Sequence, residues 1–217
     1  MIMVISAEWW KLRSFRPVLL TVIGTVVAAV LISLALAELA RQQSAPASAV
    51  DIAHDTVRYL QAGVVLLGIL PVAQEYAGRQ IGTTLSAVPQ RIRLVAAKAV
   101  AAAMLLAVTS FLAVGAAVVS AALAGRPVVF GRGLAGLAGP AGSLVLMGLL
   151  SLAATLMVRQ LLPALVGMLC LILVLPPVLS GLPGLGRWLP GTGGAVLVAW
   201  VAVAGVAGTI RFARSDA

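Results

Sequence analysis

The chain has 217 residues, of which 62% are hydrophobic and 10% charged, and its mean hydropathy is +1.13. A soluble globular domain carries about 25% charged residues, so this composition excludes a water-soluble protein and predicts that much of the surface faces lipid. The 15 lysine and arginine residues outnumber the 6 acidic ones, but they lie at the ends of apolar runs, where basic side chains meet lipid head groups, which argues against nucleic-acid binding.

Stretches without Asp, Glu, Lys or Arg mark the candidate membrane-spanning helices, because one span needs about 20 apolar residues. In chain order they predict an all-α, polytopic integral membrane protein with six transmembrane helices, at residues 17–38, 57–75, 95–124, 134–158, 161–179 and 194–211. Six spans take roughly 120 residues, which leaves no room for a separate soluble domain. We therefore expect residues 1–217 to form a single transmembrane domain.

The distribution of basic residues predicts the orientation in the membrane. With the amino terminus in the cytoplasm, ten of the fifteen lysine and arginine residues are cytoplasmic and five are external, which satisfies the positive-inside rule. Both termini are therefore expected in the cytoplasm. Only two of the fifteen are lysines, and the bias towards Arg, Ala, Gly and Val indicates a GC-rich bacterial genome and hence a bacterial cytoplasmic (cell) membrane.

No residue pattern of an enzyme appears in the chain. A phosphate-binding loop needs a lysine followed by Ser or Thr, and neither Lys11 nor Lys98 is followed by either. No ionisable residue lies in the middle of a predicted span, whereas ion-coupled transporters keep such groups at membrane depth. We therefore expect neither an enzyme nor a self-sufficient ion-coupled transporter, and no cofactor.

Two interpretations are open for the polar residues that precede the second predicted span. Asp51, His54 and Asp55 could share one helix face and hold a metal ion. A simpler interpretation makes Asp55 the N-cap of a helix that begins near Thr56. We expect the capping role, and no resident metal.

The segment between the second and third predicted spans, residues 75–98, is the longest polar stretch between spans. Within it Ile81, Leu85 and Val88 recur at the spacing of one helix face. The spacing predicts a short amphipathic helix across the cytoplasmic surface. The pattern alone leaves open whether its apolar face rests on lipid or on a protein.

Two further features concern this short helix: a proline that follows it and a possible ion pair near its start. Pro89 fits the first turn of the following helix, where the amide hydrogen that proline lacks would be unpaired anyway. Glu75 and Arg79 are four residues apart and can form an ion pair on a helix surface. The short helix is thus predicted to end before Pro89.

Two motifs resemble the ABC-2 type ABC transporter permeases, the membrane-spanning subunits of that family. The first is EYAGRQIGTTL at 75–85, followed by VPQRIR at 88–93 and AK at 97–98. The second is AEWWKLRS at 7–14, which is similar to the Glu-x-x-Lys-Leu-Arg-Ser opening of many such permeases. The order of the motifs, and six spans with both ends inside, also match that family.

The resemblance implies a permease subunit of an ATP-driven exporter, paired in the lipid bilayer with a second permease copy or a paralogue and with two copies of a separate ABC ATPase subunit. It assigns ATPase coupling to a helix formed by Glu75, Gly78, Arg79, Ile81, Gly82, Thr83, Leu85, Val88 and Pro89. It assigns the amino-terminal segment to an interfacial helix anchored by Trp9, Trp10, Lys11 and Arg13.

Other functions stay open at this point. They are a stand-alone channel or facilitator, a non-transporting membrane scaffold, and a haem- or peptide-immunity-type ABC exporter subunit. A stoichiometric ATPase partner would exclude the first two, because neither a channel nor a scaffold needs one. No motif in the chain names the transported substrate.

Overall fold

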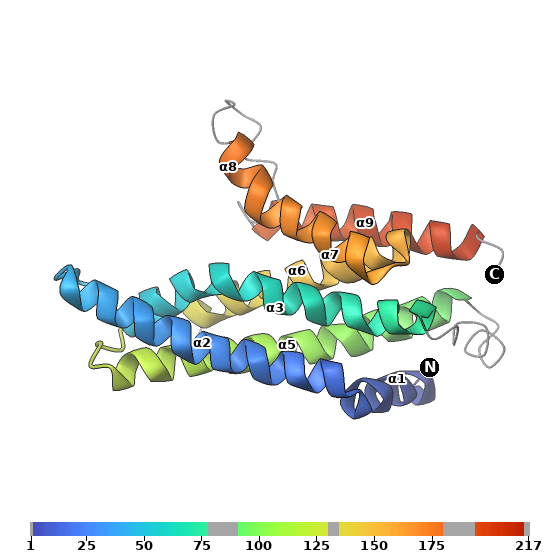
Figure 1. Ribbon diagram of the computed structural model, residues 1–217. Coiled ribbons are helices and arrows are strands. Elements are labelled where there is room, and N and C mark those ends of the chain that lie inside the picture. The colour runs from blue at the N-terminus through green and yellow to red at the C-terminus, as the bar shows by residue number, and fades with distance from the viewer. Residues whose placement is uncertain (1, 78–90, 130–134, 180–193, 215–217) are drawn as a thin grey trace.

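The computed structural model describes residues 2–77, 91–129, 135–179 and 194–214. All regular secondary structure in these ranges is helical: α1 (Ile2–Ser14), α2 (Arg16–Gln42), α3 (Ala49–Ala77), α5 (Arg91–Leu123), α6 (Ala135–Val158), α7 (Leu161–Leu169), the π-helical η1 (Cys170–Val174), α8 (Leu175–Leu179) and α9 (Gly194–Arg214). Figure 1 shows a bundle of long helices with both chain termini at one end. We call this the terminal end, and the end that holds residues 43–48 and 124–129 the distal end.

Five of the described helices are long and apolar enough to span a membrane. They comprise Arg16–Gln42, Ala49–Gln74, Ala96–Leu123, Gly136–Val158 and Gly194–Arg211. These helices coincide with five of the six predicted spans and confirm an all-α, multi-pass membrane protein. The predicted span at 161–179 is not among them, because its apolar helix Leu161–Val174 is shorter, so the count of six stays a prediction.

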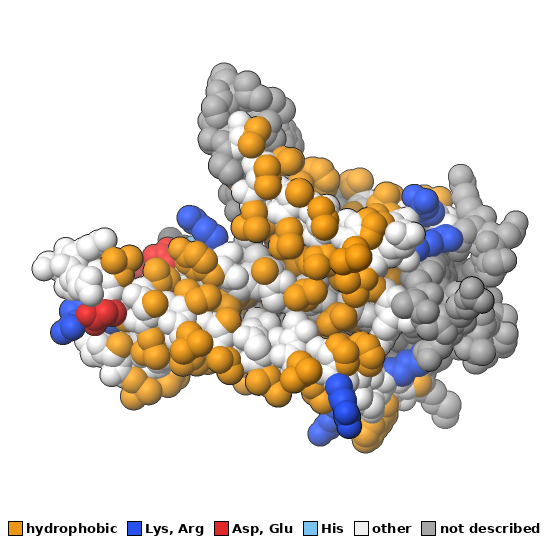
Figure 2. Space-filling view, viewed as in Figure 1, with side chains coloured by type: hydrophobic (Ala, Val, Ile, Leu, Met, Phe, Trp, Pro, Cys, Tyr) orange, Lys and Arg blue, Asp and Glu red, His pale blue; other side chains and the backbone are white. Residues whose placement is uncertain are grey.

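The lateral surface of the bundle is apolar. On the face shown in Figure 2, apolar side chains are spread along the whole described length of the bundle, and the charged side chains are few. Leu20 and Leu31 of α2 are 68% and 61% exposed, and Val203 of α9 is 69% exposed. A large contiguous apolar surface of this kind marks contact with a membrane or with another protein.

The core lies where α3, α5 and α6 meet. Its largest fully buried side chains include Leu67, Leu106 and Leu144, one from each of these helices. Lipid chains are as apolar as leucine, so close packing, rather than exclusion of water, holds helices together in a membrane.

Glycine allows α3 and α6 to approach closely. A Cβ atom added to Gly68 would overlap the carbonyl oxygen of Gly148 and the Oγ of Ser151. The Ser151 hydroxyl lies 3.0 Å from the carbonyl oxygen of Val65 on α3 and 2.7 Å from that of Gly148 on its own helix. Small residues and a hydroxyl that bonds across helices are typical of membrane helix interfaces.

Buried hydroxyl groups fix the register of α2 against its neighbours. The hydroxyls of Ser33 on α2 and Ser120 on α5 form a buried hydrogen bond with each other. Thr25 of α2 is buried beside α3, where a Cβ atom on Gly63 would overlap its side chain. Gly63 therefore lies level with Thr25 along the bundle, and Ser120 lies level with Ser33.

A reciprocal cap starts α3 at the distal end. The Ser48 amide and hydroxyl donate to the Asp51 carboxylate at 3.0 and 2.7 Å, and the Asp51 amide donates to Ser48 Oγ at 3.2 Å. This arrangement is a capping box. The expectation that Asp55 caps a helix beginning near Thr56 is therefore wrong, since α3 already begins at Ala49.

A π-helical turn interrupts the helical run from 161 to 179. The π segment η1 (Cys170–Val174) lies directly before α8, whose second residue is Pro176. Proline lacks an amide hydrogen, and its ring clashes with the carbonyl group four residues earlier, which here belongs to Ile172 in η1. A π turn relieves such a conflict by inserting an extra residue into the helix, and α8 leads away from the bundle in Figure 1.

Candidate functional site

Three parts of the chain form a cleft at the terminal end. Phe15 and Pro17 come from the α1–α2 junction, Leu70 and Gln74 from the last turns of α3, and Leu162 from α7. The cleft has a volume of about 900 Å³. Phe15 is extended (φ −86°, ψ 107°) and ends α1, while Pro17 in the first turn begins α2. The break between the two helices thus supplies one wall of the cleft.

Most of the predicted coupling residues fall outside the part of the chain that the structure describes. Glu75 belongs to the last turn of α3, and its side chain is not described. The residues outside the described ranges are Gly78, Arg79, Ile81, Gly82, Thr83, Leu85, Val88 and Pro89. The Glu75–Arg79 ion pair and the amphipathic helix stay predictions. Both flanks of the segment, the end of α3 and the start of α5, lie at the terminal end (Figure 1).

The predicted interfacial anchors lie on α1. Trp10 is 64% exposed, Lys11 and Arg13 are exposed, and Trp9 is half-buried. Leu12 is only 3% exposed, so α1 packs one face on the bundle, where it contacts α5 and α2. Tryptophan and basic side chains on the outer face are typical of a membrane–water interface, and the interfacial role of α1 stays a prediction.

Arg159 links the turn between α6 and α7 to α9. Its φ angle is +61°, and its amide donates to the carbonyl oxygen of Thr155 at 2.7 Å, which closes α6 with a left-handed cap. The Arg159 guanidinium donates to the carbonyl oxygen of Arg211 at 3.4 Å. This residue therefore connects the C-terminal ends of α6 and α9.

The left-handed conformation of Arg159 leads to a prediction about the relative stability of two variants at this position. We expect Arg159→Gly to be more stable than Arg159→Ala by about 1 kcal/mol, because a Cβ atom is disfavoured in this conformation by roughly 1–2 kcal/mol. Both variants lose the guanidinium, so their difference isolates the backbone. Thermal unfolding of the two proteins in one detergent measures it. A more stable alanine variant, the order found inside helices, would contradict the prediction.

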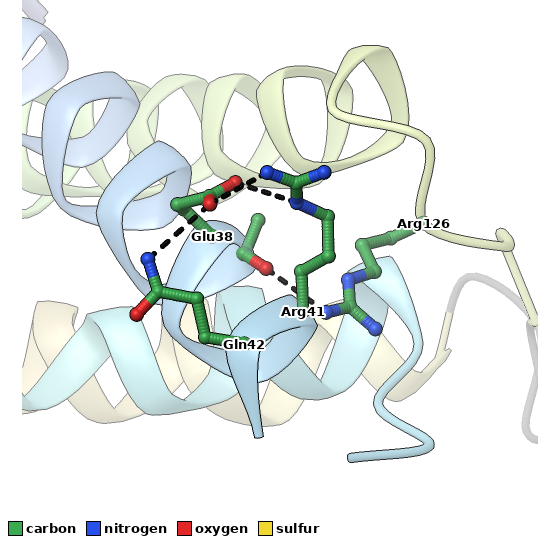
Figure 3. Close-up of polar contacts among 5 residues, drawn as sticks. Glu38, Arg41, Gln42 and Arg126 are labelled. Carbon is green, nitrogen blue, oxygen red and sulfur yellow. Dashed lines mark hydrogen bonds and ion pairs between the residues drawn. The ribbon is translucent and has the colours of Figure 1, made fainter. Parts of the chain in front are cut away.

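Arginine side chains organise the distal end, as Figure 3 shows. The Arg41 guanidinium donates to the Glu38 carboxylate at 2.8 and 2.9 Å along the same helix. Arg126 reaches across from the end of α5 and donates to the carbonyl oxygens of Ala37 and Ala45 at 2.9 and 3.1 Å. Ala37 lies in the C-terminal part of α2 and Ala45 follows that helix, so Arg126 joins the C-terminal end of α2 to the residues that follow α5.

The metal interpretation of Asp51, His54 and Asp55 is not supported. The Asp51 carboxylate is engaged by Ser48 at the start of α3. Within the described ranges, no group of three or more His, Cys, Asp or Glu side chains is arranged to hold a metal ion.

The early start of α3 brings ionisable residues into a helix that can span the membrane. His54, Asp55, Arg58 and Gln61 line a cavity of about 260 Å³ between α3, α6 and α9. The expectation that no ionisable residue lies in the middle of a span is based on a span at 57–75, whereas the apolar helix runs from Ala49 to Gln74 and includes His54, Asp55 and Arg58. The Ser-x-x-Asp pattern at residues 48–51 signals the earlier helix start and would have revealed this polar face.

The family follows from a comparison with known proteins. No curated protein matches the chain. The family model described as ABC-2 family transporter protein matches residues 4–182, a range that includes both motifs and runs from the first turn of α1 to beyond the end of α8. Given this match and the five helices long enough to span a membrane, the chain belongs to the ABC-2 family of transporter proteins and is a membrane permease of that family.

Proposed function

We propose that the chain is the membrane-spanning permease subunit of an ATP-driven exporter, and that a separate ABC ATPase subunit supplies the energy. The observation that carries this proposal is the family match over residues 4–182, because ABC-2 family membrane proteins generally partner with ATPase subunits. The permease forms the translocation path. Two ATPase copies and a second permease copy, or a paralogue, complete the complex.

In this proposal the terminal end is the docking face for the ATPase. Residues 78–90 leave α3 at Ala77 and enter α5 at Arg91. α3 and α5 are long helices that pack against each other and against α2. A displacement of this segment by the ATPase therefore acts on two spanning helices at once, since rigid helices transmit movement along their length.

The orientation belongs to the same proposal: the terminal end is in the cytoplasm of a bacterial cell. Cys170 is an exposed free cysteine and is first replaced by serine. We expect Gln43→Cys, at the distal end, to react with a membrane-impermeant maleimide in intact cells, and Ser14→Cys to react only after permeabilisation. Gln43 is preferred to Ser48 because the Ser48 hydroxyl caps α3. Labelling of Ser14→Cys in intact cells would reverse the orientation.

Because the proposed ATPase is a separate subunit, we expect that the purified chain alone neither binds nor hydrolyses ATP. Neither Lys11 nor Lys98 belongs to a phosphate-binding loop. Titration calorimetry with ATP and magnesium measures binding. ATP binding by the chain alone at micromolar affinity would contradict the prediction.

Purification of the tagged full chain from its own host tests the proposed function as a whole. An ABC ATPase should be recovered in stoichiometric amount, and reconstitution of the two proteins in proteoliposomes should stimulate its ATP hydrolysis. Recovery of the chain without an ATPase would favour the channel or scaffold.

A further inference from the structure

A polar cavity lies between α3, α6 and α9 in the distal half of the bundle. α3 contributes His54, Asp55, Arg58 and Gln61, and α6 contributes Ser143. The four residues of α3 recur at the spacing of one helix face. The cavity has a volume of about 260 Å³, so it has room for a small polar group.

The two opposite charges in this cavity are available to a ligand. Neither the Asp55 carboxylate nor the Arg58 guanidinium forms a hydrogen bond or an ion pair with any residue in the described ranges, and both side chains are exposed. By contrast Glu38 and Arg41, at the same spacing along α2, are joined at 2.8 Å. The same three-residue spacing thus gives an ion pair between Glu38 and Arg41 on α2, whereas Asp55 and Arg58 on α3 are not paired with each other.

The register of α2 and α3 places these charges at membrane depth. The two helices are antiparallel, and Gly63 lies level with Thr25. At about 1.5 Å rise per residue in both helices, Arg58 is level with Val30 and Asp55 with Ser33. The charge-free stretch 17–37 of α2 is centred near residue 27. Arg58 therefore lies about 4.5 Å and Asp55 about 9 Å from that centre.

A charged side chain that faces lipid at this depth has a high free-energy cost. Half of the hydrocarbon core is about 15 Å thick, so both residues lie inside it, and ionisable side chains there face a protein interior or a water-filled cavity. A second cavity of about 670 Å³, lined by Asp51, His54 and Arg126, lies at the distal end. His54 lines both cavities, which gives the deeper one a polar connection to the distal surface.

We propose that the cavity binds a zwitterionic amphiphile. Its cationic group lies beside Asp55, its anionic group beside Arg58, and its apolar part against Met147 and Leu197, which also line the cavity. A zwitterionic lipid head group and a soluble zwitterion share this chemistry. The proposal requires only that the chain spans a membrane. Its test therefore does not depend on whether the chain couples to an ATPase.

Native mass spectrometry of the purified full chain tests the site, with phosphatidylethanolamine as the probe. The wild type should retain this lipid, whereas Asp55→Asn and Arg58→Gln should each retain about tenfold less, as expected when one charged hydrogen bond is lost. Arg41→Gln is the matched control, because it removes a distal charge that lies outside the cavity, and it should bind like the wild type. Equal retention by all four proteins would overturn the proposal.

A competition on the wild-type chain needs no variant and so tests the proposal even where a variant does not fold. The chain should prefer phosphatidylethanolamine to phosphatidylglycerol, which has an anionic group without a cationic one, by about tenfold. Equal retention of the two lipids would overturn the proposal. Displacement of the lipid by soluble phosphoethanolamine supports a site for a soluble zwitterion, and its failure to displace the retained lipid supports a lipid site.

Discussion

Leu85→Asp is expected to abolish both the recovery of the ATPase with the permease and the transport activity, while the chain still inserts into the membrane. In the proposed coupling helix, Leu85 lies on the apolar face with Ile81 and Val88 and is buried in a groove of the ATPase. Truncation to alanine should cost about 1–3 kcal/mol of docking free energy, as for other interface anchors. Aspartate should cost more, because its carboxylate would be buried without a partner.

Ser86→Asp is the matched control for this experiment. It adds the same charge one residue further along, about 100° around the helix, and should leave ATPase recovery and transport close to the wild-type values. Co-purification and transport are measured for both variants. If Leu85→Asp shows normal values for both measurements, residues 78–90 do not dock through this face, and the helix rests on lipid instead.

Gly68→Ala is expected to destabilise the bundle by about 3 kcal/mol, at the upper end of what overpacking costs. The new methyl group would overlap the backbone carbonyl of Gly148 and the Oγ of Ser151. A backbone atom cannot rotate away as a flexible side chain can, so α3 and α6 must separate. Separation would also break the hydrogen bond from the Ser151 hydroxyl to Val65. Unfolding in mixed micelles measures the free energy change.

Gly115→Ala serves as the control for this second variant. A Cβ atom at Gly115, inside α5, would meet no atom of a neighbouring helix within 4 Å. This substitution should therefore stabilise the helix by about 0.5–1 kcal/mol, the usual gain of alanine over glycine inside a helix. Equal stability of the Gly68 and Gly115 variants would mean that α3 and α6 do not cross closely at Gly68.

The spanning helices were predictable where a charge or a cap marks each end in the sequence. The predicted span 134–158 agrees with α6 (Ala135–Val158) because Arg132 and Arg159 flank the apolar run. The sequence analysis places the start of this span too late, because it looks for stretches without charged residues and Arg58 ends that stretch. The helix in fact continues to Ala49, since the Ser48–Asp51 capping box stabilises a start that hydropathy does not detect.

The candidate sites differ in what the sequence can reveal about them. The coupling segment is contiguous, so its motif and its helical spacing can be recognised without a structure. The polar cavity requires that Arg58 of α3, Met147 of α6 and Leu197 of α9 come together. No local pattern connects residues so far apart in the chain, and their juxtaposition depends on the registers of three packed helices.

The π turn at Cys170–Val174 has a consequence for how the sequence tolerates change. An α-helix advances by about 100° per residue, and a π turn absorbs one residue more than an α turn. Deletion of one residue within this turn would remove that extra residue and restore regular α-helical geometry while α8 keeps its orientation, whereas the same deletion within α7 would rotate α8 by about 100° about its own axis. The π turn therefore allows this part of the chain to lose one residue without a rotation of α8, which the regular helix before the turn does not allow.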